Sequence, residues 1–182
     1  MNQINLDEYD LFNSSKATLK ETSADTRDNT TTEYMVYSEM EVINFDIVKT
    51  KYMNSLSASE ECAKSCDALV QINNDIMFIE FKNGSMKHKN KNVRDKAKDS
   101  LLIFGDITGK TLSYTRKNLV FVLVYNPKQN LSERPSLNKI IDRINKKADT
   151  ETIRFELGKL KGVYFRDVHT YTPEEFERNY LT

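Results

Sequence analysis

Two short apolar runs separated by a polar turn constrain the fold of this chain more than any other feature. Residues 68–72 and 76–81 are rich in strand-forming side chains, and Asn73, Asn74 and Asp75 lie between them. Strand formers on both sides of a turn-prone cluster predict a β-hairpin. The other predicted elements can be arranged around this hairpin.

The predicted hairpin carries charged residues at one end. Asp67 precedes its first strand, and Glu80 and Lys82 lie at the end of its second strand. Side chains alternate between the faces of a strand, so Glu80 and Lys82 share a face, and pairing of the strands brings Asp67 near them. An isolated charge is expensive to bury, which indicates that these groups have a partner or a task. A salt bridge between Glu80 and Lys82 at a strand end is an equally good explanation.

Converging carboxylates in such an arrangement suit a divalent metal ion. Asp67, Glu80 and the backbone carbonyl of Phe81 would supply the hard oxygen ligands that Mg²⁺ or Mn²⁺ prefers, and would leave positions for water and phosphate. The ion would lower the pKa of a bound water and offset charge on a phosphodiester. Lys82 would orient the attacking water or stabilise the developing charge.

These residues resemble the core signature of the PD-(D/E)xK nuclease superfamily. The similarity consists of Cys66-Asp67, with Cys66 in the place of a proline, and of residues 76–84, Ile-Met-Phe-Ile-Glu-Phe-Lys-Asn-Gly. The resemblance covers residues 40–126. It implies an α/β protein with a central mixed β-sheet flanked by helices and a restriction-endonuclease-like αβββαβ core.

The same resemblance implies helper residues from two helices. A leading helix often supplies a further Glu, for which Glu41 is preferred because its neighbours are apolar, with Glu39, Glu60 and Glu61 as rivals. A following helix often supplies a Lys, Arg or Gln, and Lys96 is the preferred helper there, with Arg94 beside it.

Charge is distributed unevenly along a chain of 182 residues whose formal net charge is zero. Residues 1–46 hold ten acids and three bases, so the compensating positive charge lies in the rest. Residues 13–32 contain few apolar side chains, and we therefore expect residues 1–33 to form an acidic, polar, flexible arm in front of one domain, residues 34–182. A solvated tail is favoured over an arm that covers a basic groove or binds a partner.

Apolar spacing predicts the other elements. Asp46 is the predicted cap of a helix that runs to Leu56, and residues 92–104 have the spacing of a second helix. The nearly unbroken apolar run 118–125 predicts a strand covered on both faces. Further towards the C-terminus we expect a helix at 135–147, strands at 153–157 and 162–171, and a last helix with Thr172 as cap, Pro173 at its first position and Glu175 in a capping box.

A basic stretch follows the hairpin and precedes the hydrophobic stripe of the second helix. Its candidate contacts to nucleic acid are Lys87, Lys89, Lys91, Arg94 and Lys98. A local excess of positive charge suits a phosphate backbone. A solvated basic face that keeps the protein soluble is the plainer alternative.

The sequence thus predicts a nuclease that depends on Mg²⁺ or Mn²⁺ and acts on DNA in preference to RNA. The alternative is a non-catalytic binding protein of the same fold, such as an inhibitor, an immunity factor or a nucleic-acid-binding subunit. A protein partner or a homodimer stays open. No apolar run approaches the ~20 residues of a membrane span and no signal peptide is recognisable, so the chain is expected to be cytoplasmic.

Overall fold

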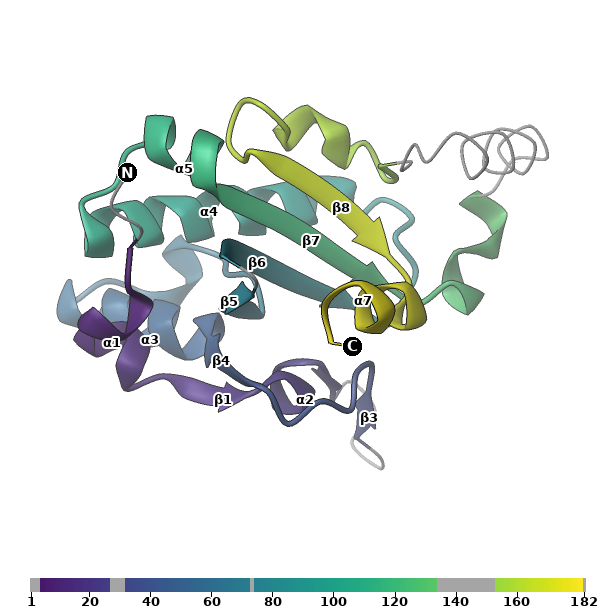
Figure 1. Ribbon diagram of the computed structural model, residues 1–182, viewed down its shortest axis with the longest axis horizontal. Helices are drawn as coiled ribbons and strands as arrows, with labels where there is room; N and C mark the ends of the chain where they lie inside the picture. Colours follow the sequence, from purple (N-terminus) through teal and green to yellow (C-terminus); the bar gives the residue numbers. More distant parts are fainter. Residues whose placement is uncertain (1–3, 27–31, 73, 134–152, 182) are drawn as a thin grey trace.

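The computed structural model describes residues 4–26, 32–72, 74–133 and 153–181. Its centre is a six-stranded mixed β-sheet with helices packed against both faces (Figure 1). The strands follow one another in space as β1 (Lys16–Thr18), β4 (Glu41–Asn44), β5 (Ala68–Ile72), β6 (Asp75–Lys82), β7 (Leu119–Tyr125) and β8 (Asp167–Tyr171). The expected α/β class, with a mixed sheet flanked by helices, is confirmed.

The sheet combines an antiparallel half with a parallel half. Strands β1, β4, β5 and β6 pair in antiparallel fashion, whereas β6, β7 and β8 are parallel neighbours. β5 and β6 form the predicted hairpin, in which Ile72 pairs with Asp75 and Asn74 adopts a left-handed φ of 71°. Asn tolerates this conformation better than most residues, which explains the turn. Parallel strands need a long crossover, and the chain between β6 and β7 supplies it.

Most of the helices lie against one face of the sheet. There Phe78 and Phe121 of the strands pack with Phe12, Phe45 and Phe104 of three helices. The helices concerned are α1 (Asp10–Asn13), α3 (Phe45–Ser55) and α4 (Asn90–Thr108), and α4 continues through a turn into α5 (Leu112–Asn118). Short 3₁₀ helices occur at Leu6–Glu8, Glu60–Cys62 and Leu157–Leu160, and a longer one, kinked at Asn130, at Lys128–Glu133.

The opposite face of the sheet is covered by two short helices. Leu19 of α2 (Leu19–Thr22) and Phe176 of α7 (Pro173–Tyr180) pack there against Ile79 and Val122. Since helices cover it from both sides, every residue of β7 is buried, as its unbroken apolar run predicts.

Residues 4–26 belong to the folded body, so the expectation of a flexible arm does not hold for them. β1 extends the sheet by pairing with β4, and Phe12 and Leu19 are fully buried. A second, two-stranded sheet follows, made of β2 (Ala24–Asp25) and β3 (Glu33–Tyr34). In this polar segment Leu19 is fully buried, whereas Ala17 and Ala24 are half-buried. Residues 27–31 lie outside the described part of the chain.

The remaining expectations are met in part. The cap of α3 is Asn44, whose side chain accepts the Ile47 N–H at 3.2 Å, and not Asp46. No strand forms at 153–157, where a turn leads into the 3₁₀ helix that begins at Leu157, and β8 begins only at Asp167. Positive φ angles at Phe155, Glu156 and Gly162 interrupt the extended backbone. The capping box of α7 is present as predicted. The helix expected at 135–147 lies outside the described residues.

In the parts of the chain that the structure describes, no helix has the length and apolar character needed to cross a bilayer.

Candidate functional site

Asp67 is fixed at the open end of the hairpin by hydrogen bonds to β6. Its backbone N–H donates to the Ile79 carbonyl at 3.1 Å, and its side-chain Oδ2 accepts the Phe81 N–H at 2.6 Å. The Asp67 carboxylate therefore accepts the Phe81 N–H in place of a backbone carbonyl, at a point of the chain just before β5 begins. This contact holds Asp67 beside the strand that carries Glu80.

The carboxylates of Asp67 and Glu80 converge on one cationic atom, the Nζ of Lys96. This ammonium lies 2.8 Å from Glu80 Oε1 and 3.3 Å from Asp67 Oδ1. The Glu80 side chain is only 3% exposed, against 16% for Asp67 and 24% for Lys96. The predicted meeting of two carboxylates is present, and the amine that joins them comes from α4 rather than from Lys82.

The three charges influence one another strongly because little water reaches them. Burial, followed by the charge of Asp67, raises the pKa of Glu80 well above its ordinary value, while Lys96 opposes the rise. Burial also raises the pKa of Asp67, against the opposing effect of Lys96. Burial alone would lower the pKa of Lys96, but Glu80 and Asp67 outweigh it and raise that pKa. Lys96 is therefore charged at neutral pH.

A third carboxylate, that of Asp46, stands next to this cluster. Asp46 lies in the first turn of α3, accepts a short hydrogen bond from the Ser65 hydroxyl, and contributes to the raised pKa values of both Asp67 and Glu80. Sequence reasoning assigned Asp46 to helix capping. The signal available was its position at a helix start directly after strand β4, whose last residue, Asn44, pairs with Ala68 beside Asp67.

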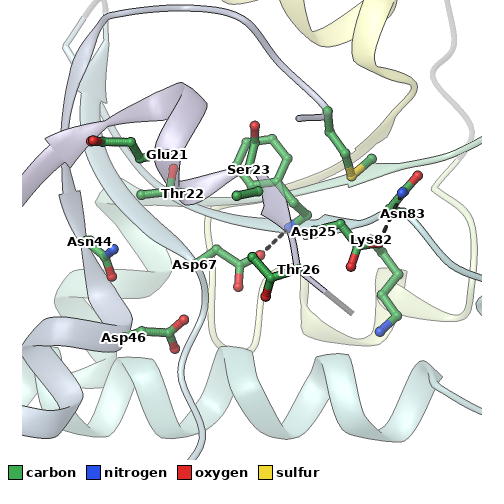
Figure 2. A pocket seen from close by; sticks show the side chains of 13 residues that line it. Glu21, Thr22, Ser23, Asp25, Thr26, Asn44, Asp46, Asp67, Lys82 and Asn83 are labelled. Carbon is green, nitrogen blue, oxygen red and sulfur yellow. Dashed lines mark hydrogen bonds between the residues drawn. The ribbon is translucent and has the colours of Figure 1, made fainter. Parts of the chain in front are cut away.

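A pocket of about 280 Å³ opens in front of Asp67. Figure 2 shows the Asp67 carboxylate in its middle, with Asp46 on one side and Lys82 and Asn83 on the other. Lys82 thus shares the pocket with Asp67, although its amine extends away from that carboxylate in the same view. The lining residues are Glu21, Thr22, Ser23, Ala24, Asp25, Thr26, Met35, Asn44, Asp46, Asp67, Phe81, Lys82 and Asn83.

The leading-helix acids are placed elsewhere. Glu41 lies in strand β4, and its exposed carboxylate is 3.2 Å from the Lys16 amine, beside a different pocket. Glu39 pairs with Lys20 and Glu60 with Lys49, both with exposed carboxylates. The expectation for Glu41 required a helix at this point, and the chain forms a strand instead.

The predicted nucleic-acid contacts divide into two groups. Lys87, Lys89 and Lys91 are exposed at or just before the start of α4, where Lys91 pairs with Asp95. The other two point to the C-terminal segment. Arg94 lies 3.5 Å from a carboxylate oxygen of Glu156, and the Lys98 amine lies 5.4 Å from the centre of the Tyr164 ring.

A hard divalent cation needs oxygen ligands, which this cluster offers from two carboxylates. Among the described residues, no group of three or more acidic, His or Cys side chains is arranged to hold a metal. Mg²⁺ often takes only one or two carboxylates and completes its shell with water and phosphate, which Asp67 and Glu80 would satisfy. Phe81 turns its N–H towards Asp67, so its carbonyl lies on the same edge of β6. These oxygens fit such an ion, with the Lys96 ammonium as its competitor.

Comparisons with protein-family models, with curated proteins and with solved structures give no match for this chain.

Proposed function

We propose that the protein is a metal-dependent nuclease with a PD-(D/E)xK-like site, acting on DNA in preference to RNA. The observation that carries this proposal is the convergence of the Asp67 and Glu80 carboxylates on one cation position beside an open pocket. Buried carboxylates on adjacent strands are costly, and a function in metal binding gives a reason for them.

The order of elements around the site supports the same proposal. A hairpin (β5 and β6) carries both acids, a crossover helix (α4) follows, and a parallel strand (β7) lies beside the second hairpin strand. This is the order that the resemblance implies for the second half of a restriction-endonuclease-like core. The assignment of that specific core is part of the proposal.

In this proposal, the residues have separate tasks. Asp67 and Glu80, with the Phe81 carbonyl, hold Mg²⁺ or Mn²⁺, which when bound lowers the pKa of water and offsets phosphate charge. Lys96 balances the carboxylates before the ion arrives and afterwards remains close enough to contact an anionic group. Lys82 lines the same pocket, where a lysine can position water or a phosphate oxygen.

Exposed lysines near the site support a nucleic-acid substrate. Lys87 and Lys89 are exposed on the segment that leads from the end of β6 to α4, and Lys91 follows in the first turn. The site and this basic segment are thus joined by a few residues of chain. Phosphate contacts by such lysines position a nucleic acid without selecting its sequence.

The Lys96 ion pairs favour a second candidate, a non-catalytic binding protein. An ammonium at 2.8 Å from Glu80 already supplies the charge that the carboxylates need. If that ion pair is permanent, added metal does not bind between the carboxylates, and the protein would instead bind a nucleic acid or another protein without cleaving it.

Thermal denaturation in a series of Mn²⁺ or Mg²⁺ concentrations distinguishes the two candidates. A site that binds metal in the folded state raises the melting temperature as the metal concentration grows, by mass action. Glu80→Gln keeps the shape of the side chain but removes the charge that a hard cation needs, so it should abolish most of the rise. Glu39→Gln is the matched control, because Glu39 is exposed and lies outside the pocket.

Cleavage assays on the same proteins complete the test. Wild type and Glu39→Gln should cleave nucleic acid only with metal present, and Glu80→Gln should not. Negligible and equal melting shifts in all three proteins, together with no cleavage, would reject the nuclease and leave the binding protein.

A further inference from the structure

We propose that the candidate site accepts a single strand of nucleic acid and excludes a duplex. This inference rests on the proposed function and names the substrate class of the same pocket. It follows from the depth of the carboxylates, from the wall that stands beside them, and from an exposed aromatic side chain next to that wall.

The carboxylates lie below the protein surface. Glu80 is 3% exposed and is not among the pocket-lining residues, so its carboxylate is buried beneath the pocket surface, where it shares Lys96 with Asp67. The pocket volume, about 280 Å³, is close to the lower limit of small-ligand pockets, ~300 Å³. A group about the size of one nucleotide can enter such a space. A duplex is too wide for this space, because each nucleotide that enters the pocket would bring its paired nucleotide and the second backbone with it.

One wall of the pocket is the N-terminal segment, which is attached to the end of β6. Asn83 donates from its single Nδ2 atom to Asp25 at 3.0 Å and to Glu33 at 2.9 Å. Asn126 donates to Asn83 Oδ1 at 2.7 Å, and this fixes the amide with its NH₂ group towards the acids. Residues 21–26 thereby line the pocket from Glu21 on one side to Asp25, which lies beside Asn83, on the other (Figure 2).

The charge of this wall opposes a second phosphate backbone. Asp25 and Glu33 face each other across the β2–β3 pair, a juxtaposition of like charges that is unfavourable without a shared donor such as Asn83. Glu21 adds a further carboxylate to the rim of the pocket. For a strand bound in the pocket, attraction to Lys82 and to the site metal would offset this repulsion. The complementary strand of a duplex would lie outside the pocket, without that attraction.

Tyr37 offers a surface for an unpaired base. It is 71% exposed, follows the pocket-lining Met35 by two residues, and its ring lies 5.9 Å from that of Tyr34 in β3. An exposed aromatic ring beside a nucleic-acid site stacks on unpaired bases of any sequence, and a paired base in a duplex is not available to it.

The test measures binding of two labelled DNA probes by fluorescence anisotropy in Ca²⁺. One probe is a single strand of about 12 nucleotides, within the site sizes known for single-strand binders, and the other is the matching duplex. We expect the wild type to bind the single strand at least tenfold more tightly than the duplex. Tyr37→Ala should weaken single-strand binding about fivefold or more, and Tyr37→Phe, which keeps the ring, should restore it.

Asn83→Ala tests the wall separately. Loss of the amide releases Asp25 and Glu33, so duplex binding should increase and the preference should shrink. Equal binding of the two probes by the wild type, or equal single-strand affinities of Tyr37→Ala and Tyr37→Phe, would overturn the inference while leaving the nuclease proposal intact. Failure of both probes to bind would reject the proposed function and the inference together.

Discussion

Replacement of Lys96 by Met tests whether the Asp67–Glu80–Lys96 cluster has the charges described above. Met keeps the apolar stem of the side chain but leaves two carboxylates without their ammonium, one of them only 3% exposed. Removal of one partner from a buried ion pair costs about 3–5 kcal/mol. Lys96 retains 24% exposure, so we expect the lower end, about 3 kcal/mol. For a chain of this size that corresponds to a fall of about 10 °C in Tm.

The loss should depend on pH in a defined direction. The folded-state pKa values of Asp67 and Glu80 lie above their ordinary values, so these groups favour folding most at low pH and lose that contribution as pH rises through the folded pKa. Lys96 opposes the rise of both pKa values, and its removal raises them further. Lys96→Met should therefore be nearly harmless below about pH 4, where both carboxyls are protonated, and should show its full cost near pH 8.

The assay is thermal or urea denaturation of wild type and variant between these two pH values. Lys91→Met is the matched control, since Lys91 lies on the same helix but is exposed and pairs with Asp95 on the surface, and it should change stability by less than about 0.5 kcal/mol throughout. A Lys96→Met protein that is as stable as wild type at pH 8, or that loses the same amount at both ends of the range, would refute the charge assignment.

Two further predictions test the fold. Phe12→Ala should cost about 3–5 kcal/mol in chemical denaturation because Phe12 is fully buried among Phe45 and Phe104, and a loss below 1 kcal/mol would mean that the N-terminal segment is not docked. Thr172→Ala should cost about 1 kcal/mol because it removes the side-chain acceptor of the α7 capping box, whereas Thr172→Ser should cost almost nothing.

The elements that could be predicted from the sequence are those whose signals are local. The hairpin, the buried strand β7 and the capping box of α7 each depend on residues adjacent in the chain. The docking of the polar segment 13–26 was not predicted, because its composition hides Leu19, which is buried only through tertiary packing. Composition averages over a segment, whereas burial is decided residue by residue.

Strand pairing predicted that the two carboxylates of the candidate site meet, but it did not predict which lysine lies between them. Asp67 and Glu80 follow from strand pairing, which has a fixed geometry. The reach of Lys96 depends on how α4 packs across the sheet, and the resemblance alone indicated it as a helper. Lys82 shares the face of Glu80 by alternation, yet it ends the strand, and its side chain lines the pocket with the amine directed away from Asp67.

The charge balance of the cluster gives a physical reason to expect a second cation. Two carboxylates and one ammonium leave one negative charge over, and Asp46 adds its influence from α3. A buried excess charge is unstable, and either a proton on Glu80 or an added cation must relieve it. A binding protein that works without metal would relieve the excess negative charge with a proton on Glu80. A nuclease would relieve the charge with a divalent ion. The ion would bind at neutral pH only if its binding free energy exceeds the cost of removing that proton and weakening the Lys96 ion pairs. The occupant that the folded protein prefers at neutral pH, a proton or a divalent ion, therefore distinguishes the proposed nuclease from the proposed binding protein.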